Sequence, residues 1–433
     1  MTCLTLWVLK WTATLILLNF YWGSQMFEDL EKQSLTGLSG LVKREFIGDD
    51  VSALKKNVTK LKEAIAADVN RTISKHDASD ESKMIVPNLQ DGTLQGKERL
   101  WKILQTRNVT EVDAAYWATV PTWGEILSNL YPKSHDITEA GPIIHGLETC
   151  QAFQAATASN PTQRRIAPAG IFNTGTNYLS VLLEYNCQNP HRVAKFNNNP
   201  KRGHGNEWEV LWGKHTPAHH RGKYYKNTKH NYDVHEVLPV VLIRNPFGWM
   251  KSMCRNSYSA SWAGKGDVSS CPQLKKNGDW NEVDVKFGPG STHHKSLAHM
   301  WNDWYGEYFY NNYTMNSTME DRINLTAPFP RLMIRFEDII FFPYEVTQQI
   351  CNCAGGVLGH RPDDTDVANS TFHYVVRSAK TGGGHGPASQ RNGLIDSWVR
   401  YGKSDPRNEY DDESAGIAEE ALDKLIVKAF GYG

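Results

Sequence analysis

Three short apolar runs, each followed by a turn and an amphipathic helical pattern, are the most regular feature of this chain. They cover residues 166–172, 238–243 and 332–336. Continuous apolar runs bounded by turn residues are typical of parallel strands that are buried on both faces of a sheet. Strands that alternate with helices predict an α/β fold, in which helices flank a parallel β-sheet and ligands bind at the carboxyl ends of its strands.

Further elements are predicted around these units. One more strand is expected at residues 208–212, and helices are expected at residues 97–105 and 343–353. A helical pattern over residues 116–131 contains Pro121, which should interrupt it because proline cannot continue the hydrogen-bond ladder. Residues 188–232 are polar and longer than an ordinary connection, so we expect a functional or disordered segment there.

The first hundred residues predict a membrane-anchored layout. Residues 4–22 are apolar except for Lys10, Asn19 and a few threonines, and this length suits a bilayer span. We expect an uncleaved signal anchor in residues 1–24, with a cleaved signal peptide as the alternative. Residues 25–96 are interpreted as stem and linker. An apolar 3-4 spacing over residues 51–65 fits either a solvated helix or a short coiled coil that would form a homodimer. Residues 97–433 are then the folded domain.

Glycosylation signals and cysteines indicate the compartment. Asn-x-Ser/Thr sequons follow the apolar segment at about twice the frequency that chance would give, which places the folded domain in the secretory lumen and the N-terminus in the cytosol. Their asparagines are Asn57, Asn70, Asn108, Asn312, Asn316, Asn324 and Asn369. Apart from Cys3 at the membrane end, the cysteines number six, which allows three disulfides in an oxidising lumen.

The disulfide pairing stays open, because six cysteines can pair in about fifteen ways. Our working expectation is that Cys150 bonds with Cys187 and that Cys254 bonds with Cys271. The remaining cysteines, at 351 and 353, are poorly placed to bond with each other.

Charge and metal patterns narrow the possible ligands. The chain has 47 Lys and Arg residues against 47 Asp and Glu residues, so it has no global field that would attract nucleic acid. No Cys-x-x-Cys pair and no His–Cys spacing of the zinc type occurs, so no metal is expected.

Two strand–turn–helix units carry candidate anion sites. After the first strand, Asn173-Thr174-Gly175-Thr176 form a turn whose backbone N–H groups lie at a helix N-terminus, where anions bind readily. After the second strand come Arg244, then Pro246 at the first helical position, and Ser252 about two turns later. Two such sites on neighbouring units suit a ligand that is phosphorylated at both ends.

This pair of segments resembles the sulfotransferase family. Residues 172–179 are similar to the family's 5′-phosphosulfate loop, and Arg244 with Ser252 is similar to its 3′-phosphate motif. Residues 297–308 are similar to its aromatic helix, and residues 332–343 to its strand and R/Y-x-E-D turn. The resemblance covers roughly residues 166–356, with a weaker tail to about residue 401.

The resemblance implies a P-loop-like three-layer fold and an enzyme. Such enzymes transfer a sulfuryl group from 3′-phosphoadenosine 5′-phosphosulfate (PAPS) to a hydroxyl or amine, without a metal. Together with the anchor, it implies a single-pass Golgi membrane protein with a lumenal catalytic domain, and a glycan is the first expectation for the acceptor. It also implies that the donor is held by Asn173, Thr174, Gly175, Thr176, Asn177, Tyr178, Arg244 and Ser252.

The chain departs from the family at Asn173, where the loop usually carries Lys or Arg. Lys214 is the best candidate for a replacement cation, and the adjacent His215 is the candidate catalytic base, because histidine titrates near working pH. Both are expected just past the end of the strand at 208–212. The rival bases are His204, His219, His220, His230, His235, Glu184 and Glu207. Candidates for further phosphate or acceptor contacts are Lys380, Arg391, Lys201 and Arg202.

Other functions remain open. A lumenal binding protein that has lost turnover would also explain Asn173. A glycosyltransferase would use an acidic metal motif, for which Asp363-Asp364-Thr365-Asp366 is the candidate. A nucleotide kinase is disfavoured because no Gly-Lys-Ser/Thr ends the first loop. Glu337-Asp338 is expected to be a structural turn and helix start.

Overall fold

A computed structural model describes residues 94–109, 112–131, 141–195, 204–224, 226–227, 232–267, 271–288, 290–310, 329–359, 372–378 and 393–433. The predicted anchor and nearly all of the stem, Cys3 and every sequon asparagine except Asn108 lie outside these ranges. The same holds for His230, Lys201, Arg202, Lys380, Arg391 and the acidic motif at residues 363–366. None of the helices within the described ranges is long and apolar enough to cross a membrane.

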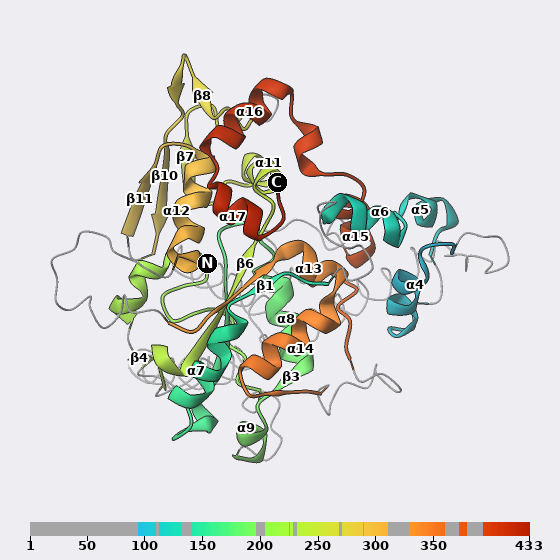
Figure 1. The fold of residues 1–433 in the computed structure, drawn as a ribbon, viewed down its shortest axis with the longest axis vertical. Helices are drawn as coiled ribbons and strands as arrows, with labels where there is room; N and C mark the ends of the chain where they lie inside the picture. The colour runs from blue at the N-terminus through green and yellow to red at the C-terminus, as the bar shows by residue number, and fades with distance from the viewer. Residues whose placement is uncertain are drawn as a thin grey trace, which may run out of the picture. The chain divides into compact units, whose positions relative to one another are not determined.

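A mostly parallel sheet of four strands lies at the centre of the fold (Figure 1). Its order is β1 (Ile144–His145), β12 (Leu332–Arg335), β6 (Val237–Ile243) and β2 (Arg165–Ala169). Strands β2 and β12 run parallel to β6, and the short edge strand β1 runs antiparallel to β12. Three of the four strands are those predicted from the apolar runs, within a few residues at each end.

Both faces of this sheet are buried, as continuous apolar strands require. Along β6, Leu238, Val240 and Leu242 pack into one hydrophobic cluster. The alternating Val237, Val241 and Ile243 pack into another. Because successive side chains of a strand point to opposite faces, the two clusters mark the two layers that cover the sheet.

Helices cover both faces. The cluster on the first face includes α4 (Glu98–Gln105), α5 (Ala114–Thr119), α6 (Trp123–Leu130), α7 (Cys150–Ala156), α8 (Thr176–Asn186), α13 (Phe336–Phe341), α14 (Pro343–Cys353) and α15 (Leu394–Gly402). The cluster on the second face includes α11 (Pro246–Arg255), α12 (Leu297–Phe309), α16 (Asp412–Ala421) and α17 (Lys424–Ala429). A three-stranded sheet of β7 (Ala260–Trp262), β10 (Val283–Phe287) and β11 (Gly290–His294) joins the second face (Figure 1).

Smaller elements complete the described part of the chain. These are β3 (Cys187–Gln188), α9 (Pro190–Lys195), β4 (Lys226–Asn227), β5 (Tyr232–Asp233), β8 (Lys275–Lys276), β9 (Asp279–Trp280) and β13 (Val357–Leu358). The predicted helices at residues 97–105 and 343–353 are confirmed as α4 and α14. Pro121 separates α5 from α6, as expected from its missing N–H.

The strand predicted at residues 208–212 is wrong. The chain makes a single bridge from Asn206 to Ile166 and then turns, with Gly213 in the left-handed region at φ 100°. Val210 and Trp212 are buried although Trp208 is exposed, so the apolar residues of this segment are buried without forming a ladder with another strand. Trp212 instead donates its indole N–H to the hydroxyl of Tyr308 on α12, at 3.1 Å.

Three disulfides form, and one predicted pair is wrong. Cys254 bonds with Cys271 as expected, but Cys150 bonds with Cys353 and Cys187 with Cys351. Strand β3, which begins at Cys187, pairs with β13 directly after α14 and so brings Cys187 to that helix. This long-range pairing is invisible in the spacing of the cysteines. The three bonds are consistent with an oxidising compartment.

Candidate functional site

The carboxyl ends of β2, β6 and β12 meet at one edge of the sheet. Gly170 follows β2, Arg244 follows β6, and Phe336 follows β12. The parallel register sets these ends side by side, because Ala169 pairs with Val241 and Arg335 pairs with Ile243. This edge is where open α/β sheets bind ligands.

The turn between β2 and α8 is a tight loop with two left-handed residues. Asn173 has φ 64° and Gly175 has φ 78°. A Cβ atom on Gly175 would lie 2.4 Å from the ring of Phe336, the first residue of α13, so only glycine fits against this ring. The hydroxyl of Thr174 donates to the carbonyl of Ile171 at 2.7 Å and closes the turn from within. The loop therefore leads into α8 with its backbone N–H groups at the sheet edge.

Arg244 lies beside this loop and is only 5% exposed. Its Nη1 donates to the carbonyl of Asn173 at 2.9 Å. Its guanidinium lies over the rings of Phe336 and Tyr401, 5.1 Å from each centroid. It forms no ion pair with any residue in the described ranges, so its charge is available to an anion.

Helix α11 places a hydroxyl and further cations near Arg244. Asn245 caps the helix, Pro246 is its first residue, and Ser252 lies two turns along. The Ser252 hydroxyl is buried and donates to the carbonyl of Gly248 at 3.0 Å. Burial and the charges of Arg400 and Arg244 lower the pKa of Arg255 in the last turn.

Arg255 and Arg400 were not predicted from the sequence. Arg255 comes three residues after Ser252 and so lies on nearly the same face of α11, a spacing that could have indicated it. Arg400 could not have been found this way, because it comes from α15, which is remote in the sequence.

Lys214 contacts the residue that follows β2 and the first turn of α8. Its carbonyl accepts from the N–H of Gly170 at 3.0 Å, and its Nζ donates to the Asn177 side chain in the first turn of α8, also at 3.0 Å. The ammonium lies 3.5 Å from the centroid of the Trp208 ring. Burial lowers the pKa of Lys214 to about 8, although the charge of Glu209 opposes this shift.

His215 faces the same loop. Its Nδ1 lies 2.6 Å from the carbonyl of Gly170. A carbonyl oxygen can only accept, so Nδ1 carries the proton and Nε2 keeps a lone pair in the neutral ring. Burial lowers the pKa of His215 to about 4; the hydrogen bond to Gly170 opposes this shift and Lys214 adds to it. Trp304 of α12 fixes the backbone by donating to the His215 carbonyl at 2.9 Å.

The remaining predicted residues divide into two groups. Thr174, Gly175, Thr176 and Asn177 belong to the loop and the first turn of α8. Tyr178 packs instead among the side chains between α8 and the segment at residues 372–375, so its ring does not join the loop. Asn173 turns its amide away from the loop, toward the end of α11, where it donates to the carbonyl of Asn256.

The rival bases that the structure describes have other positions and partners. Glu207 pairs with Arg165, the first residue of β2, which is the other end of that strand from the loop. His204 and His235 also lie near the amino ends of the strands, because Gly205 bonds to Ile166 and His235 precedes β6. His219 pairs with Glu307 of α12, and Glu184 is exposed on α8. His220 is buried beside Gly290 of β11.

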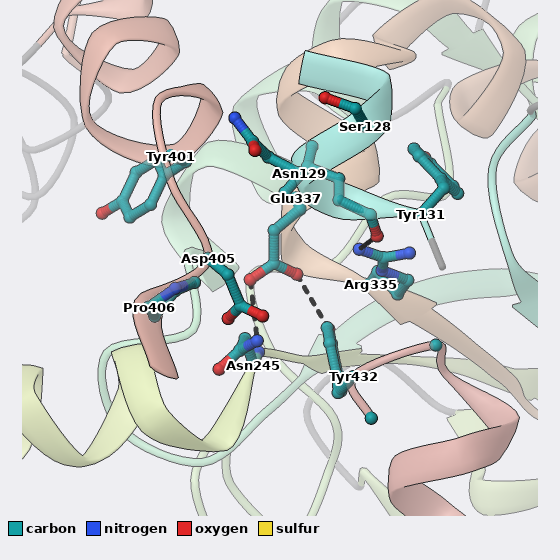
Figure 2. Close-up of a pocket in the computed structure, with 13 residues that line it drawn as sticks. Ser128, Asn129, Tyr131, Asn245, Arg335, Glu337, Tyr401, Asp405, Pro406 and Tyr432 are labelled. Carbon is teal, nitrogen blue, oxygen red and sulfur yellow. Dashed lines mark hydrogen bonds between the residues drawn. The ribbon is translucent and has the colours of Figure 1, made fainter. Parts of the chain in front are cut away.

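A pocket of about 150 Å³ adjoins Arg244 and was not predicted from the sequence (Figure 2). Tyr401, which also contacts Arg244, lines it together with Asn245 and Glu337. The Glu337 carboxylate accepts from the Tyr432 hydroxyl at 2.8 Å and from the Asn245 N–H at 3.2 Å. Arg335, 1% exposed, also lines the pocket, and its Nε and Nη1 have no hydrogen-bond partner.

Glu337 and Asp338 begin α13, as predicted for a structural turn. Asp338 is buried and accepts from the Tyr131 hydroxyl and from the N–H of Ile143. Within the described ranges, no cluster of three His, Cys, Asp or Glu residues could hold a metal ion.

Comparison of the chain with models of known protein families, with curated proteins and with solved structures finds no match. The arrangement of residues at the sheet edge is therefore what a functional assignment can be built on.

Proposed function

We propose that this protein is a sulfotransferase that binds PAPS at the carboxyl edge of its sheet and transfers the sulfuryl group to an acceptor hydroxyl or amine. One observation carries the proposal: the hydrogen bond of 2.9 Å from Arg244 to the carbonyl of Asn173 joins the two turns. A ligand with an anion at each end can therefore contact both turns at once. In this proposal, the fold is the P-loop-like three-layer type.

The donor would be held by two sets of groups. The N–H groups of the loop at residues 173–177 suit the 5′-phosphosulfate, because helix N-termini stabilise anions. Arg244 and Ser252 suit the 3′-phosphate, and Arg255 and Arg400 add positive charge beside them. The pocket next to Arg244 is below the usual size of a whole-ligand site, so it suits one heterocyclic base.

Lys214 supplies the charge that Asn173 lacks. Its ammonium bonds to Asn177 in the first turn of α8, so it lies beside the loop without belonging to it. A charge-assisted hydrogen bond contributes about twice as much as a neutral one. Lys214 can therefore stabilise the charge that builds on the 5′-phosphate as the sulfur–oxygen bond breaks.

His215 acts as the general base. PAPS supplies a sulfuryl group, and transfer forms a new sulfur–oxygen bond to the acceptor while the bond from sulfur to the 5′-phosphate oxygen breaks. Nε2 of His215 takes the acceptor proton, since its lone pair is free while Nδ1 is held by Gly170. A nearby anionic donor raises the pKa of His215 from about 4 toward working pH, which makes it a better base.

The acceptor would approach between two exposed aromatic rings. Trp208 is 52% exposed and lies under Lys214, while Tyr258 is 43% exposed, with its ring centroid 6.3 Å from that of His215. Flat exposed rings beside a reactive group suit the apolar face of a sugar. We therefore propose that the acceptor is a glycan. We also propose that an N-terminal anchor holds the protein in the Golgi membrane. The stem-mediated homodimer stays a prediction.

The first experiment is calorimetric titration of the purified protein with adenosine 3′,5′-bisphosphate (PAP), without metal. Wild type should bind in the micromolar range, and Arg244→Ala should weaken binding by roughly 10- to 100-fold, because charged hydrogen bonds contribute about 1.5–3 kcal/mol. Lys276→Ala, which removes an exposed cation from β8, is the matched control and should bind normally. A folded wild type that does not bind PAP would overturn the proposal.

A binding protein without turnover is the second candidate. Asn173 favours it, because the residue brings no charge to the loop and turns its amide away. Incubation with radiolabelled PAPS and a mixture of desulfated glycans separates the two. Sulfate transfer that is lost in His215→Ala but not in Lys276→Ala supports the enzyme, and PAP binding without any transfer supports the binding protein.

A further inference from the structure

We propose that Asn173 is a positioning residue that couples the two anion sites, so that an anion held by Arg244 strengthens binding at the 5′ loop, and the reverse. The inference rests on the proposed function, because it concerns a ligand that occupies both turns. Asn173, which stands where the sulfotransferase loop usually carries Lys or Arg, would then have a role of its own and would not simply lack a charge.

Asn173 contacts both ends of helix α11. Its carbonyl accepts from Arg244, which immediately precedes the N-cap of the helix, at 2.9 Å. Its side-chain amide donates to the carbonyl of Asn256, the C-cap of the same helix, at 2.8 Å. The amide also lies 3.3 Å from the sulfur of Met253. One loop residue is thus fixed to the start and to the end of the helix that carries Ser252.

A third hydrogen bond joins the loop to the middle of α11. The indole N–H of Trp249 donates to the carbonyl of Phe172 at 2.7 Å. The loop and the helix therefore form one hydrogen-bonded unit. An anion that orders Arg244 also orders the carbonyl of Asn173, and with it the N–H groups that follow in the loop.

The residue type fits this role. Asn173 has φ 64°, a conformation that asparagine tolerates better than most residues. Its amide supplies the donor that the Asn256 carbonyl needs. A lysine here would be strained at this φ and would leave the Asn256 carbonyl without its partner. It would add a charge to the loop but remove the hydrogen bond between the loop and the end of α11.

The consequence is a coupling between two sites that is equal in both directions. It appears as the factor by which the 3′-phosphate improves binding, measured as the affinity for PAP relative to that for adenosine 5′-monophosphate (AMP). That factor has two parts: the direct contact between the 3′-phosphate and Arg244, and the ordering of the loop that this contact causes. Removing the amide of Asn173 weakens the second part only, because it frees the loop from the end of α11 and leaves the bond between Arg244 and the Asn173 carbonyl in place.

The test compares PAP and AMP binding by calorimetry in wild type, Asn173→Gly and Asn173→Lys. Glycine keeps the positive φ without the amide, and we expect the PAP-to-AMP factor to fall about fivefold or more. Lysine adds a charge, yet we expect weaker PAP binding and a smaller factor. Asn277→Gly is the matched control, since Asn277 also has a positive φ, of 54°, in the exposed β8–β9 turn, and it should leave the factor unchanged.

The outcomes separate this inference from the proposed function. If wild type does not bind PAP, the proposed function fails. If wild type binds PAP but Asn173→Gly keeps the wild-type factor at an unchanged melting temperature, the coupling is overturned. If Asn173→Lys binds PAP more tightly than wild type, the position lacks only a charge and the coupling is overturned as well.

Discussion

His215, the proposed general base, has a marked cost of protonation in the folded protein. Its pKa of about 4 in the folded protein lies below the ordinary 6.5, so as pH falls the unfolded chain takes up the proton first. Stability from this group is therefore full above pH 6.5 and is lost as pH falls toward 4. Because part of the ring is open to solvent, we expect a loss of about 1–2 kcal/mol between pH 7 and pH 5.

Urea unfolding of wild type and His215→Gln at the two pH values measures this loss. Glutamine keeps a donor for the Gly170 carbonyl but does not titrate. The variant should lose less stability than wild type on acidification, while the other histidines contribute equally to both. Equal losses in the two proteins would show that His215 is not buried in its neutral form.

Lys214 predicts a pH dependence of the opposite sign for ligand binding. An anion binds the protonated amine, so PAP affinity should fall as pH rises through the pKa of about 8. Linkage limits the fall to about tenfold between pH 7 and pH 9. Lys214→Met keeps an unbranched side chain beside Trp208 without the charge; it should bind PAP more weakly at pH 7 and lose the dependence of affinity on pH. A fall that persists in the variant would assign it to another group.

Individual site residues differ in how far the sequence predicts them. Arg244 and Ser252 are defined by local spacing; Arg244 bonds to the loop, and Ser252 lies on the helix that follows Arg244. The direction of the Asn173 amide was not predictable, because its partner Asn256 becomes a neighbour only when α11 packs on the loop. The same holds for Arg400, which reaches the site from the far end of the chain.

At the scale of elements, α12 shows why an aromatic helix accompanies this site. Trp301 donates to the carbonyl of Arg244 at 3.0 Å, and Tyr305 to that of Leu242 at 2.9 Å. Trp304 donates to His215 from the same helix. The carbonyls of Leu242 and Arg244 lie at and past the end of β6, where the sheet no longer supplies partners, and the carbonyl of His215 lies in a turn. The helix therefore holds the backbone of the site in place.

The disulfides predict two separable effects. Cys187 caps the far end of α8, so Cys187→Ala/Cys351→Ala should lower the free energy of unfolding by about 2–4 kcal/mol and leave PAP affinity of the folded protein unchanged. Cys254 lies in the last turn of α11, next to Met253 and near Asn256. Cys254→Ala/Cys271→Ala should therefore also weaken PAP binding severalfold. Denaturant unfolding and calorimetry measure both, and equal affinity losses in the two variants would contradict the prediction.

Strands and helices were predictable where one short segment decides them. The apolar runs of β2, β6 and β12 and the helix α14 follow from local pattern, because burial on both faces leaves a continuous signature. The strand predicted at residues 208–212 was wrong, because Trp212 is buried by packing against α12 and not by a ladder with another strand. The three-stranded sheet of β7, β10 and β11 was missed, because it is built from short segments with no comparable run.

Across the whole molecule, the zero net charge gives no indication of the cations that lie at the candidate site. Acidic and basic residues are equal in number along the chain. At the sheet edge, however, Lys214, Arg244, Arg255 and Arg400 come from three different segments of the chain, and no described carboxylate forms an ion pair with Arg244. The sequence average could exclude a global field, but only the fold shows that these four cations lie near one edge of the sheet.

The pairing of Cys187 with Cys351 also sets a timetable for synthesis. The two residues are 164 positions apart, and chains grow at about 5–20 residues per second, so Cys187 waits on the order of 8–33 s for its partner to be made. Cys150, whose own partner is 203 positions away, waits at the same time. Throughout that interval the two early cysteines are available to each other. The nascent chain must therefore keep Cys150 and Cys187 apart, or exchange a premature bond between them. Only then can α14, which carries Cys351 and Cys353, form its two native disulfides.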